Sequence, residues 1–113
     1  MGKIGRIFRK TWSILMKKPS NFSWIIEGRL AGSGRPMNPR DLQWMKRQGV
    51  AALLSLTEKP LPDGWAEKAE LIYSNTPLLD HKPPTVEQIE ETVNFITDHL
   101  AKGNPVAVHC AAG

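Results

Sequence analysis

The chain has 113 residues, which is enough for one small domain. Its composition, 41% hydrophobic and 23% charged, is that of an ordinary globular protein and excludes collagen-like, mucin-like and disulfide-stapled proteins. Because the chain has one cysteine, no internal disulfide can form, and the reducing cytoplasm is the expected compartment. The apolar runs are too short to cross a bilayer, and no signal-peptide core follows the first residue.

The net charge of +4 is unevenly distributed along the chain. Six of the 15 basic residues lie in residues 1–26, which contain no acidic residue. The remaining nine basic residues and all 11 acidic residues lie in residues 27–113, so this larger part is mildly acidic. This distribution predicts a basic N-terminal arm and argues against a nucleic-acid-binding surface over the whole protein.

Residues 1–18 predict a basic amphipathic helix, which Pro19 ends. Its apolar face contains Ile4, Ile7, Phe8, Trp12, Ile14 and Leu15. Such a helix lies on an anionic membrane surface, docks on a partner, or packs on its own domain, and the sequence leaves these alternatives open. We therefore divide the chain into an arm of residues 1–19 and a domain of residues 20–113, and keep peripheral membrane association as an alternative to a purely cytoplasmic location.

The first half of the domain predicts strands and one short helix. Residues 22–31 are typical of one or two strands broken at Gly28, and the glycines that follow predict a turn at residues 32–34. Asn38 is a good N-cap for a helix that ends at Gly49.

The alternation of strands and helices continues through the second half. Residues 50–56 form an almost continuous apolar run, which is typical of a strand covered on both faces in a parallel sheet. One or two helical turns are expected at residues 65–70, and a strand at residues 71–78.

The clearest helix begins at a capping box formed by Thr85 and Gln88, carries an apolar face, and ends at Gly103. A short buried strand at residues 106–108 follows it. The alternation predicts an α/β fold with a parallel-type central sheet flanked by helices.

In an open parallel sheet, functional sites form at the carboxyl ends of the strands. Three predicted strand ends carry chemically useful groups: Thr57-Glu58, Leu79-Asp80-His81 and His109-Cys110. A carboxylate and a thiol at one sheet edge are the ingredients of nucleophilic catalysis with a general acid.

Cys110 becomes a nucleophile when nearby backbone N–H groups or positive charge stabilise its thiolate. The small residues after it, Ala111, Ala112 and Gly113, allow such amides to approach an anion closely. The alternative interpretations are that Cys110 is a small buried residue at a strand end and that Asp80 is a solvated loop carboxylate.

The residues around Cys110 carry a family resemblance. Residues 106–113, Val-Ala-Val-His-Cys-Ala-Ala-Gly, resemble the strand and the first half of the signature loop of cysteine-dependent protein phosphatases, which reads H-C-x-x-G-x-x-R followed by Ser or Thr. Upstream, residues 21–24, 28–32 and 54–58 resemble the small atypical dual-specificity phosphatases, in the same order and at similar spacing. The resemblance covers residues 20–113.

The resemblance implies a role for each matching position. Cys110 matches the nucleophile, Asp80 the general acid, and His109 the residue that helps to hold the nucleophile as a thiolate. The backbone amides of Ala111, Ala112 and Gly113 match part of the phosphate cradle. Such enzymes use no metal and no cofactor, and the histidines of the chain show no ligand spacing.

The family pattern continues beyond what this sequence contains. After the glycine of the loop it has an arginine that grips the phosphoryl oxygens, a hydroxyl residue and further helices, and no such positions follow Gly113. We therefore expect residues 20–113 to be the N-terminal portion of a dual-specificity phosphatase-like domain with its C-terminal helices missing, and the chain alone to be inactive.

The leading interpretation is a phosphatase acting on phosphotyrosine, and on phosphoserine or phosphothreonine as further candidates, in a phosphoprotein or phosphopeptide. A rhodanese-like sulfurtransferase also places a cysteine after a parallel strand, but it needs no acid at Asp80. A phosphate-binding or membrane-recruited module without catalysis is the other alternative. Arg29, Arg35 and Glu58 are candidates for the mouth of the site, and surface solvation explains them equally well.

Overall fold

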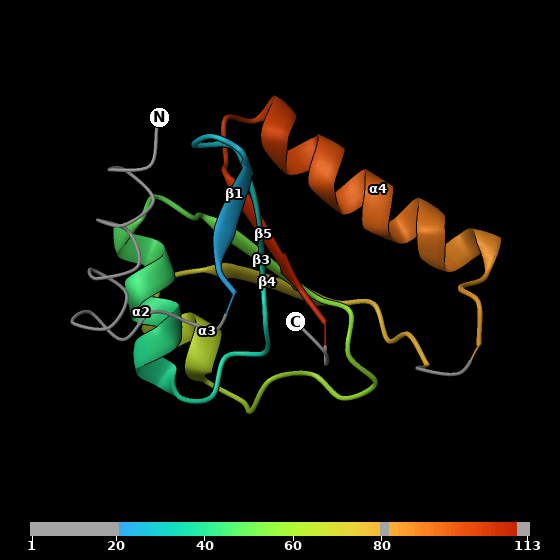
Figure 1. Ribbon diagram of the computed structural model, residues 1–113, viewed down its shortest axis with the longest axis horizontal. Coiled ribbons are helices and arrows are strands. Elements are labelled where there is room, and N and C mark those ends of the chain that lie inside the picture. Colours follow the sequence, from blue (N-terminus) through green and yellow to red (C-terminus); the bar gives the residue numbers. More distant parts are fainter. Residues whose placement is uncertain (1–20, 80–81, 111–113) are drawn as a thin grey trace.

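The computed structural model describes residues 21–79 and 82–110, which form a five-stranded sheet with helices on both faces (Figure 1). Its strands are β1 (Ser23–Ile26), β2 (Leu30–Ser33), β3 (Ala52–Ser55), β4 (Ile72–Asn75) and β5 (Val106–His109). The helices in this part of the chain are α2 (Pro39–Arg47), α3 (Trp65–Lys68) and α4 (Val86–Ala101). The predicted α/β fold with a parallel-type central sheet is confirmed. The helix predicted for residues 1–18 lies outside the described residues.

The strands lie in the order β1-β2-β5-β3-β4, so β5 occupies the centre of the sheet. The strands β2, β5, β3 and β4 run parallel, and β1 joins the edge antiparallel to β2. Ser33, His109, Ser55 and Asn75 are register partners in one row across the four parallel strands. The carboxyl ends of these four strands therefore meet at one edge of the sheet.

The strands β1 and β2 form a hairpin whose turn contains Gly28 at a φ of +71°, a conformation that glycine adopts without steric cost. The break predicted there is confirmed, but the turn predicted at residues 32–34 is wrong for its first two residues. Gly32 and Ser33 continue β2, because the parallel ladder pairs them with Val108 and His109. Hydrogen bonding to a strand far away in the sequence outweighs the local turn preference.

Helix α2 begins as the sequence predicts. The side chain of Asn38 accepts a hydrogen bond from the backbone N–H of Asp41 at 3.3 Å, and Pro39 is the first helical residue. The carboxylate of Asp41 in turn accepts a bond from the N–H of Met37 at 2.8 Å. The helix then buries Leu42 completely against the sheet.

The main hydrophobic core lies between the sheet and the pair α2 and α3. Its buried members come from β2, α2, β3 and β5 and from the segments beside them: Phe22, Ala31, Leu42, Trp44, Met45, Val50, Leu53, Leu61, Ala69, Leu71 and Ala107. Leu53 and Ala107 are register partners. Because side chains alternate along a strand, Ser55 and His109, two residues further on, face the same side as this core.

Helix α4 crosses the opposite face of the sheet (Figure 1). The predicted capping box of Thr85 and Gln88 is present, with both reciprocal hydrogen bonds. None of its residues is fully buried, and Val86 and Val93 are 70% and 49% exposed. None of the helices within residues 21–79 and 82–110 combines the length and the apolar character that crossing a bilayer requires.

The strand predicted for residues 71–78 is shorter than expected. β4 ends at Asn75, and the backbone N–H of Thr76 makes the last bond, to the carbonyl of Ser55 at 2.9 Å. Pro77 follows, and proline has no N–H to donate to the ladder. The chain therefore leaves the sheet well before Asp80.

Candidate active site

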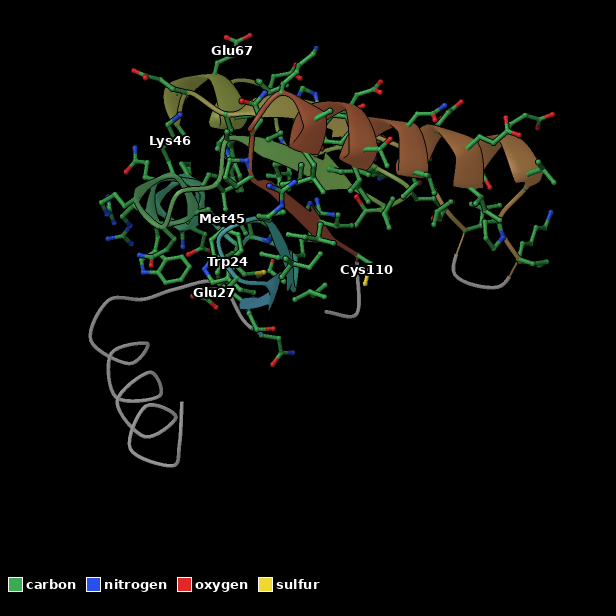
Figure 2. All side chains as sticks on the ribbon, turned by 90° about the horizontal axis from the view of Figure 1, so that it is seen from above. Trp24, Glu27, Met45, Lys46, Glu67 and Cys110 are labelled. Carbon is green, nitrogen blue, oxygen red and sulfur yellow. The ribbon has the colours of Figure 1, made fainter. Side chains whose placement is uncertain are left out.

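Cys110 directly follows β5, and its side chain is exposed at the end of that strand (Figure 2). It therefore lies at the carboxyl edge of the sheet, next to the ends of β2 and β3. The backbone N–H of Leu56 donates to the carbonyl of His109 at 2.8 Å, which extends the ladder between β3 and β5 up to the residue before the thiol. The exposure contradicts the alternative in which Cys110 is a small buried residue.

His109 is buried beside the thiol position, with 1% of its surface exposed. Its Nε2 forms a 2.5 Å hydrogen bond with the Oγ of Ser55, its register partner on β3. Burial lowers the pKa of His109 from the ordinary 6.5 to about 4; the backbone of Cys110 opposes this shift, and the charge of Arg35 adds to it. The imidazole is therefore neutral at physiological pH.

The other ring nitrogen of His109, Nδ1, has no partner in hydrogen-bond geometry among the described residues. The backbone of Cys110 is the group that favours a proton on this ring.

The sequence did not single out the polar residues that organise this edge. The side-chain amide of Asn75 donates to the carbonyls of Ser55 and Thr57, each at 3.0 Å, and so closes the end of β3. Ser55 belongs to residues 54–58, which carry part of the family resemblance, but no role was assigned to it. A buried hydroxyl needs a partner, and that signal could have marked it.

Three further candidates are separated by the fold. Arg35 follows the carboxyl end of β2, and Glu58 follows that of β3, so both lie at the edge that carries Cys110. Arg29 is exposed in the hairpin turn at the opposite end of β2, so it belongs to the surface and not to the mouth of the site. Arg35 is close enough to His109 for its charge to act on the ring.

Four of the predicted site residues lie outside the described residues: Asp80, Ala111, Ala112 and Gly113. Within residues 21–79 and 82–110, no three His, Cys, Asp or Glu side chains are grouped in a way that could hold a metal ion.

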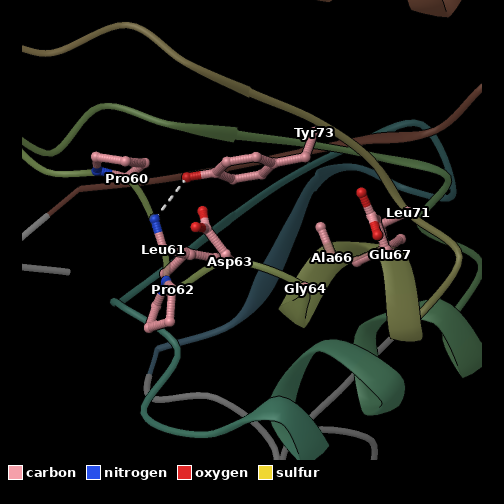
Figure 3. Close-up of a pocket in the computed structure, with 9 residues that line it drawn as sticks. All are labelled: Pro60, Leu61, Pro62, Asp63, Gly64, Ala66, Glu67, Leu71 and Tyr73. Carbon is pink, nitrogen blue, oxygen red and sulfur yellow. Dashed lines mark hydrogen bonds between the residues drawn. The ribbon is translucent and has the colours of Figure 1, made fainter.

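A pocket of about 340 Å³ lies between the loop of residues 60–64, α3 and β4 (Figure 3). Tyr73 and Leu61 line it, and Cys110 does not. Cys110 and His109, the described members of the predicted site, are not among its lining residues, so we do not assign the catalytic site to this pocket.

The sequence of residues 19–113 matches the family described as Swiss Army Knife protein, DSP-PTPase phosphatase domain (PTP-SAK). This match covers most of the chain. The chain belongs to this family. The resemblance to dual-specificity phosphatases is thereby confirmed.

Solved phosphatase structures share the fold of this domain. Tk-PTP in its active form is 30% identical, with a TM-score of 0.66, over 76% of this chain and 59% of Tk-PTP. A putative phosphatase from Shewanella putrefaciens CN-32 is 23% identical, with a TM-score of 0.68, over 87% of this chain and 63% of its own. Kinase associated phosphatase, with its catalytic-site cysteine replaced by serine, is 16% identical, with a TM-score of 0.69, over 81% and 65%. The last two similarities support the fold alone.

The phosphatase domain described here therefore spans about three fifths of the length of Tk-PTP. In this part it presents one exposed thiol at the end of the central strand, a buried neutral imidazole directly before it, and a guanidinium at the same edge. This arrangement can present a sulfur nucleophile to an anionic substrate that arrives at the carboxyl edge of the sheet.

Proposed function

We propose that this domain hydrolyses phosphate monoesters of tyrosine side chains, and also those of serine and threonine, in phosphoproteins or phosphopeptides. The observation that carries the proposal is the exposed thiol of Cys110 at the end of the central strand, directly after a buried neutral His109. Membership of the DSP-PTPase family supports the same chemistry. Because a thiol nucleophile must stay reduced, we propose the cytoplasm as its compartment.

The proposed reaction consists of two displacements at phosphorus. In the first, the thiolate of Cys110 attacks in line, an S–P bond forms and the P–O ester bond breaks, while Asp80 gives a proton to the leaving oxygen. In the second, the Asp80 carboxylate accepts a proton from water, and the water oxygen attacks phosphorus. The S–P bond then breaks, which releases inorganic phosphate and regenerates the thiolate.

The remaining residues stabilise charge. We assign to His109 the support of the Cys110 thiolate, and to the backbone N–H groups of Ala111, Ala112 and Gly113 the binding of the phosphoryl oxygens. Small side chains at these three positions leave the amides accessible to an anion.

The phosphocysteine intermediate provides the decisive experiment. Because the chain alone is expected to be inactive, the test uses a protein in which the loop continues after Gly113 with the family's arginine and hydroxyl residue. This protein is mixed with p-nitrophenyl phosphate and quenched, and its intact mass is measured by mass spectrometry for the wild type, Asp80→Asn and Cys110→Ser. Because the loss of Asp80 slows the attack of water, Asp80→Asn accumulates one phosphoryl group per chain. Cys110→Ser accumulates none. Absence of a phosphoryl group from both the wild type and Asp80→Asn would contradict the proposal, and so would its presence in Cys110→Ser.

The role of Asp80 is tested by changing the leaving group. General acid catalysis contributes about 10²–10⁴-fold to rate, and it matters most when the leaving oxygen is basic. Asp80→Asn is therefore expected to lose that factor on phenyl phosphate and much less on p-nitrophenyl phosphate. Asp63→Asn, an exposed loop carboxylate, is the matched control and retains the wild-type rates. Equal loss on both substrates would remove Asp80 from this role, and turnover of thiosulfate would favour a sulfurtransferase.

A further inference from the structure

The pocket between the loop of residues 60–64, α3 and β4 contains none of the described residues of the candidate active site. Its buried lining residues are apolar: Leu61 is 4% exposed and Leu71 is 7% exposed. The ring of Tyr73 and the prolines of the loop add further apolar surface. With a volume of about 340 Å³, the pocket is at the lower end of the size range of ligand-binding pockets, which is about 300–1,000 Å³.

Two carboxylates give this pocket a negative charge. Asp63 belongs to the loop before α3 and Glu67 to α3 itself, and both side chains are exposed. Figure 3 shows both carboxylates directed to the side of the pocket on which Tyr73 lies. Within residues 21–79 and 82–110 neither carboxylate has an ion-pair partner, and no basic residue lines the pocket. An apolar base with carboxylates beside it suits lysine or arginine, because their aliphatic stems pack on apolar surface while the charged group stays in water.

The N-terminal arm of residues 1–19 supplies side chains of this chemistry. Six basic residues lie in it without any acidic residue, whereas residues 27–113 are mildly acidic. The helix predicted for residues 1–18 also has an apolar face, and an apolar helix face is stable in water only when another surface covers it. The arm and the pocket are therefore complementary in charge and in apolar character.

The chain enters the domain on the same face of the sheet as the pocket. Phe22, the second described residue, belongs to the buried cluster that also contains Leu61 and Leu71. A helix of 18 residues is about 27 Å long, which is close to the diameter of a small domain. The arm can therefore reach the pocket without passing around the sheet. Helix α4 also carries acidic and exposed apolar residues, but it lies on the opposite face (Figure 1).

A buried donor beside this entry point has no partner among the described residues. The indole Nε1 of Trp44, on α2, makes no hydrogen bond there, although the side chain is only 4% exposed. Its ring packs edge-to-face on Phe22, with the ring centroids 4.9 Å apart. Because buried donors are normally paired, we expect the acceptor of Trp44 in the segment that precedes Asn21. This observation is independent of the charges in the pocket, and it indicates that the arm lies against this face.

We propose that the pocket binds basic side chains of the chain's own N-terminal arm, with Asp63 and Glu67 as the charged contacts. Docking covers the apolar face of the arm, so an arm held in the pocket does not lie on a membrane surface at the same time. The proposal goes beyond the proposed function and does not rest on it, because neither carboxylate belongs to the candidate active site.

Zero-length cross-linking tests the contact in the intact chain. A carbodiimide joins a lysine amine to a carboxylate that touches it, and peptide mass spectrometry identifies the two residues. At low ionic strength and low protein concentration, we expect links within one chain from the lysines of the arm to Asp63 or Glu67. The double variant Asp63→Asn, Glu67→Gln should lose these links. The matched double variant Glu90→Gln, Glu91→Gln removes the same charge from α4 and should retain them.

The other cross-linking results contradict the proposal. Arm lysines joined only to carboxylates of α4 would place the arm on the opposite face. Links to Asp63 and Glu67 that form only between two chains would make a second copy the occupant of the pocket. The absence of any link from the arm at low ionic strength would also overturn the proposal.

Proteolysis of the arm gives a second readout. Trypsin cleaves after lysine and arginine only when the arm is undocked, so the rate of cleavage within residues 1–18 follows the undocked fraction. We expect cleavage to be about twofold to tenfold faster in Asp63→Asn, Glu67→Gln, the range for the loss of one or two exposed ion pairs. Glu90→Gln, Glu91→Gln should retain the wild-type rate. Equal acceleration in both double variants, or in neither, would overturn the proposal.

Discussion

The two faces of the sheet are covered to very different extents. On one face, α2 has nine residues and buries Leu42 and Met45 completely. On the other face, α4 has 16 residues and a complete capping box, yet it buries none of them. Capping and spacing therefore determine where a helix begins, whereas burial against the sheet determines how much it stabilises the fold.

The same difference explains where the buried hydrogen-bonded side chains lie. His109, Ser55 and Tyr73 face the side that α2 and α3 close. In a water-poor environment a hydrogen bond is stronger and an unpaired polar atom is more costly. The well-covered face can thus hold a neutral imidazole in one orientation, which a partly covered face could not do.

The largest effect on the free energy of unfolding is expected in the core on the sheet face that α2 and α3 cover. Leu42→Ala removes a side chain that is 0% exposed and should lower the free energy of unfolding by about 3 kcal/mol. Leu100→Ala, at the half-buried end of α4, is the matched control and should cost less than half as much. Urea unfolding followed by circular dichroism measures both. Equal losses would show that the two faces contribute alike.

Acid should lower the free energy of unfolding, because His109 is buried as a neutral ring. Because its pKa is about 4 in the folded chain and ordinarily 6.5, the unfolded chain binds more protons between these values. The contribution of neutral His109 to the free energy of unfolding is present above pH 6.5. It is lost as the pH falls toward 4, and the total loss is about 3 kcal/mol. Urea unfolding of the wild type and His109→Gln across this range isolates the effect, since both titrate the same carboxylates. A parallel decline of the two proteins would contradict it.

The helix caps offer an intermediate effect. Asn38→Ala removes the cap of α2 and should cost about 1 kcal/mol of global stability. Thr85→Ala removes the corresponding bond in α4, and because α4 buries no residue, its loss should appear as local fraying with a smaller global cost. Hydrogen exchange of the first turn of each helix, measured beside urea unfolding, distinguishes the two. A larger global cost for Thr85→Ala would reverse the comparison.

The smallest effect is expected on the outer part of α4. Val93 is 49% exposed, so Val93→Ala should change the free energy of unfolding by no more than about 0.5 kcal/mol. Val50→Ala is the matched substitution at a side chain that is 1% exposed, and it should cost several times more. A loss at Val93 comparable to that at Val50 would mean that α4 is covered in solution.

Local signals in the sequence predicted the elements well. Asn38 and Thr85 marked both helix starts, because an N-cap acts within one turn. The turn predicted at Gly32 failed because its partner strand lies more than seventy residues away in the chain, and the end of β4 was missed because Pro77 was read as part of a strand.

The candidate site was predicted less completely. The motif identified Cys110 and His109, since both belong to one short segment. The hydrogen bond between Ser55 and His109 could not be predicted, because it joins residues 54 positions apart and depends on the strand order. The pattern of residues along a strand predicts which face of the sheet a side chain occupies. It does not predict which side chain of a neighbouring strand it will contact.

The central position of β5 has a consequence for the order in which the domain forms. The hairpin of β1 and β2 and the pair of β3 and β4 share no ladder until β5 inserts between them. Pairings between distant segments form late, because the chain entropy of closing long loops must be overcome first. We therefore expect the two strand pairs to join only after β5 has been synthesised. Because β5 ends directly before Cys110, the step that joins the pairs would also bring Cys110 to the edge of the sheet.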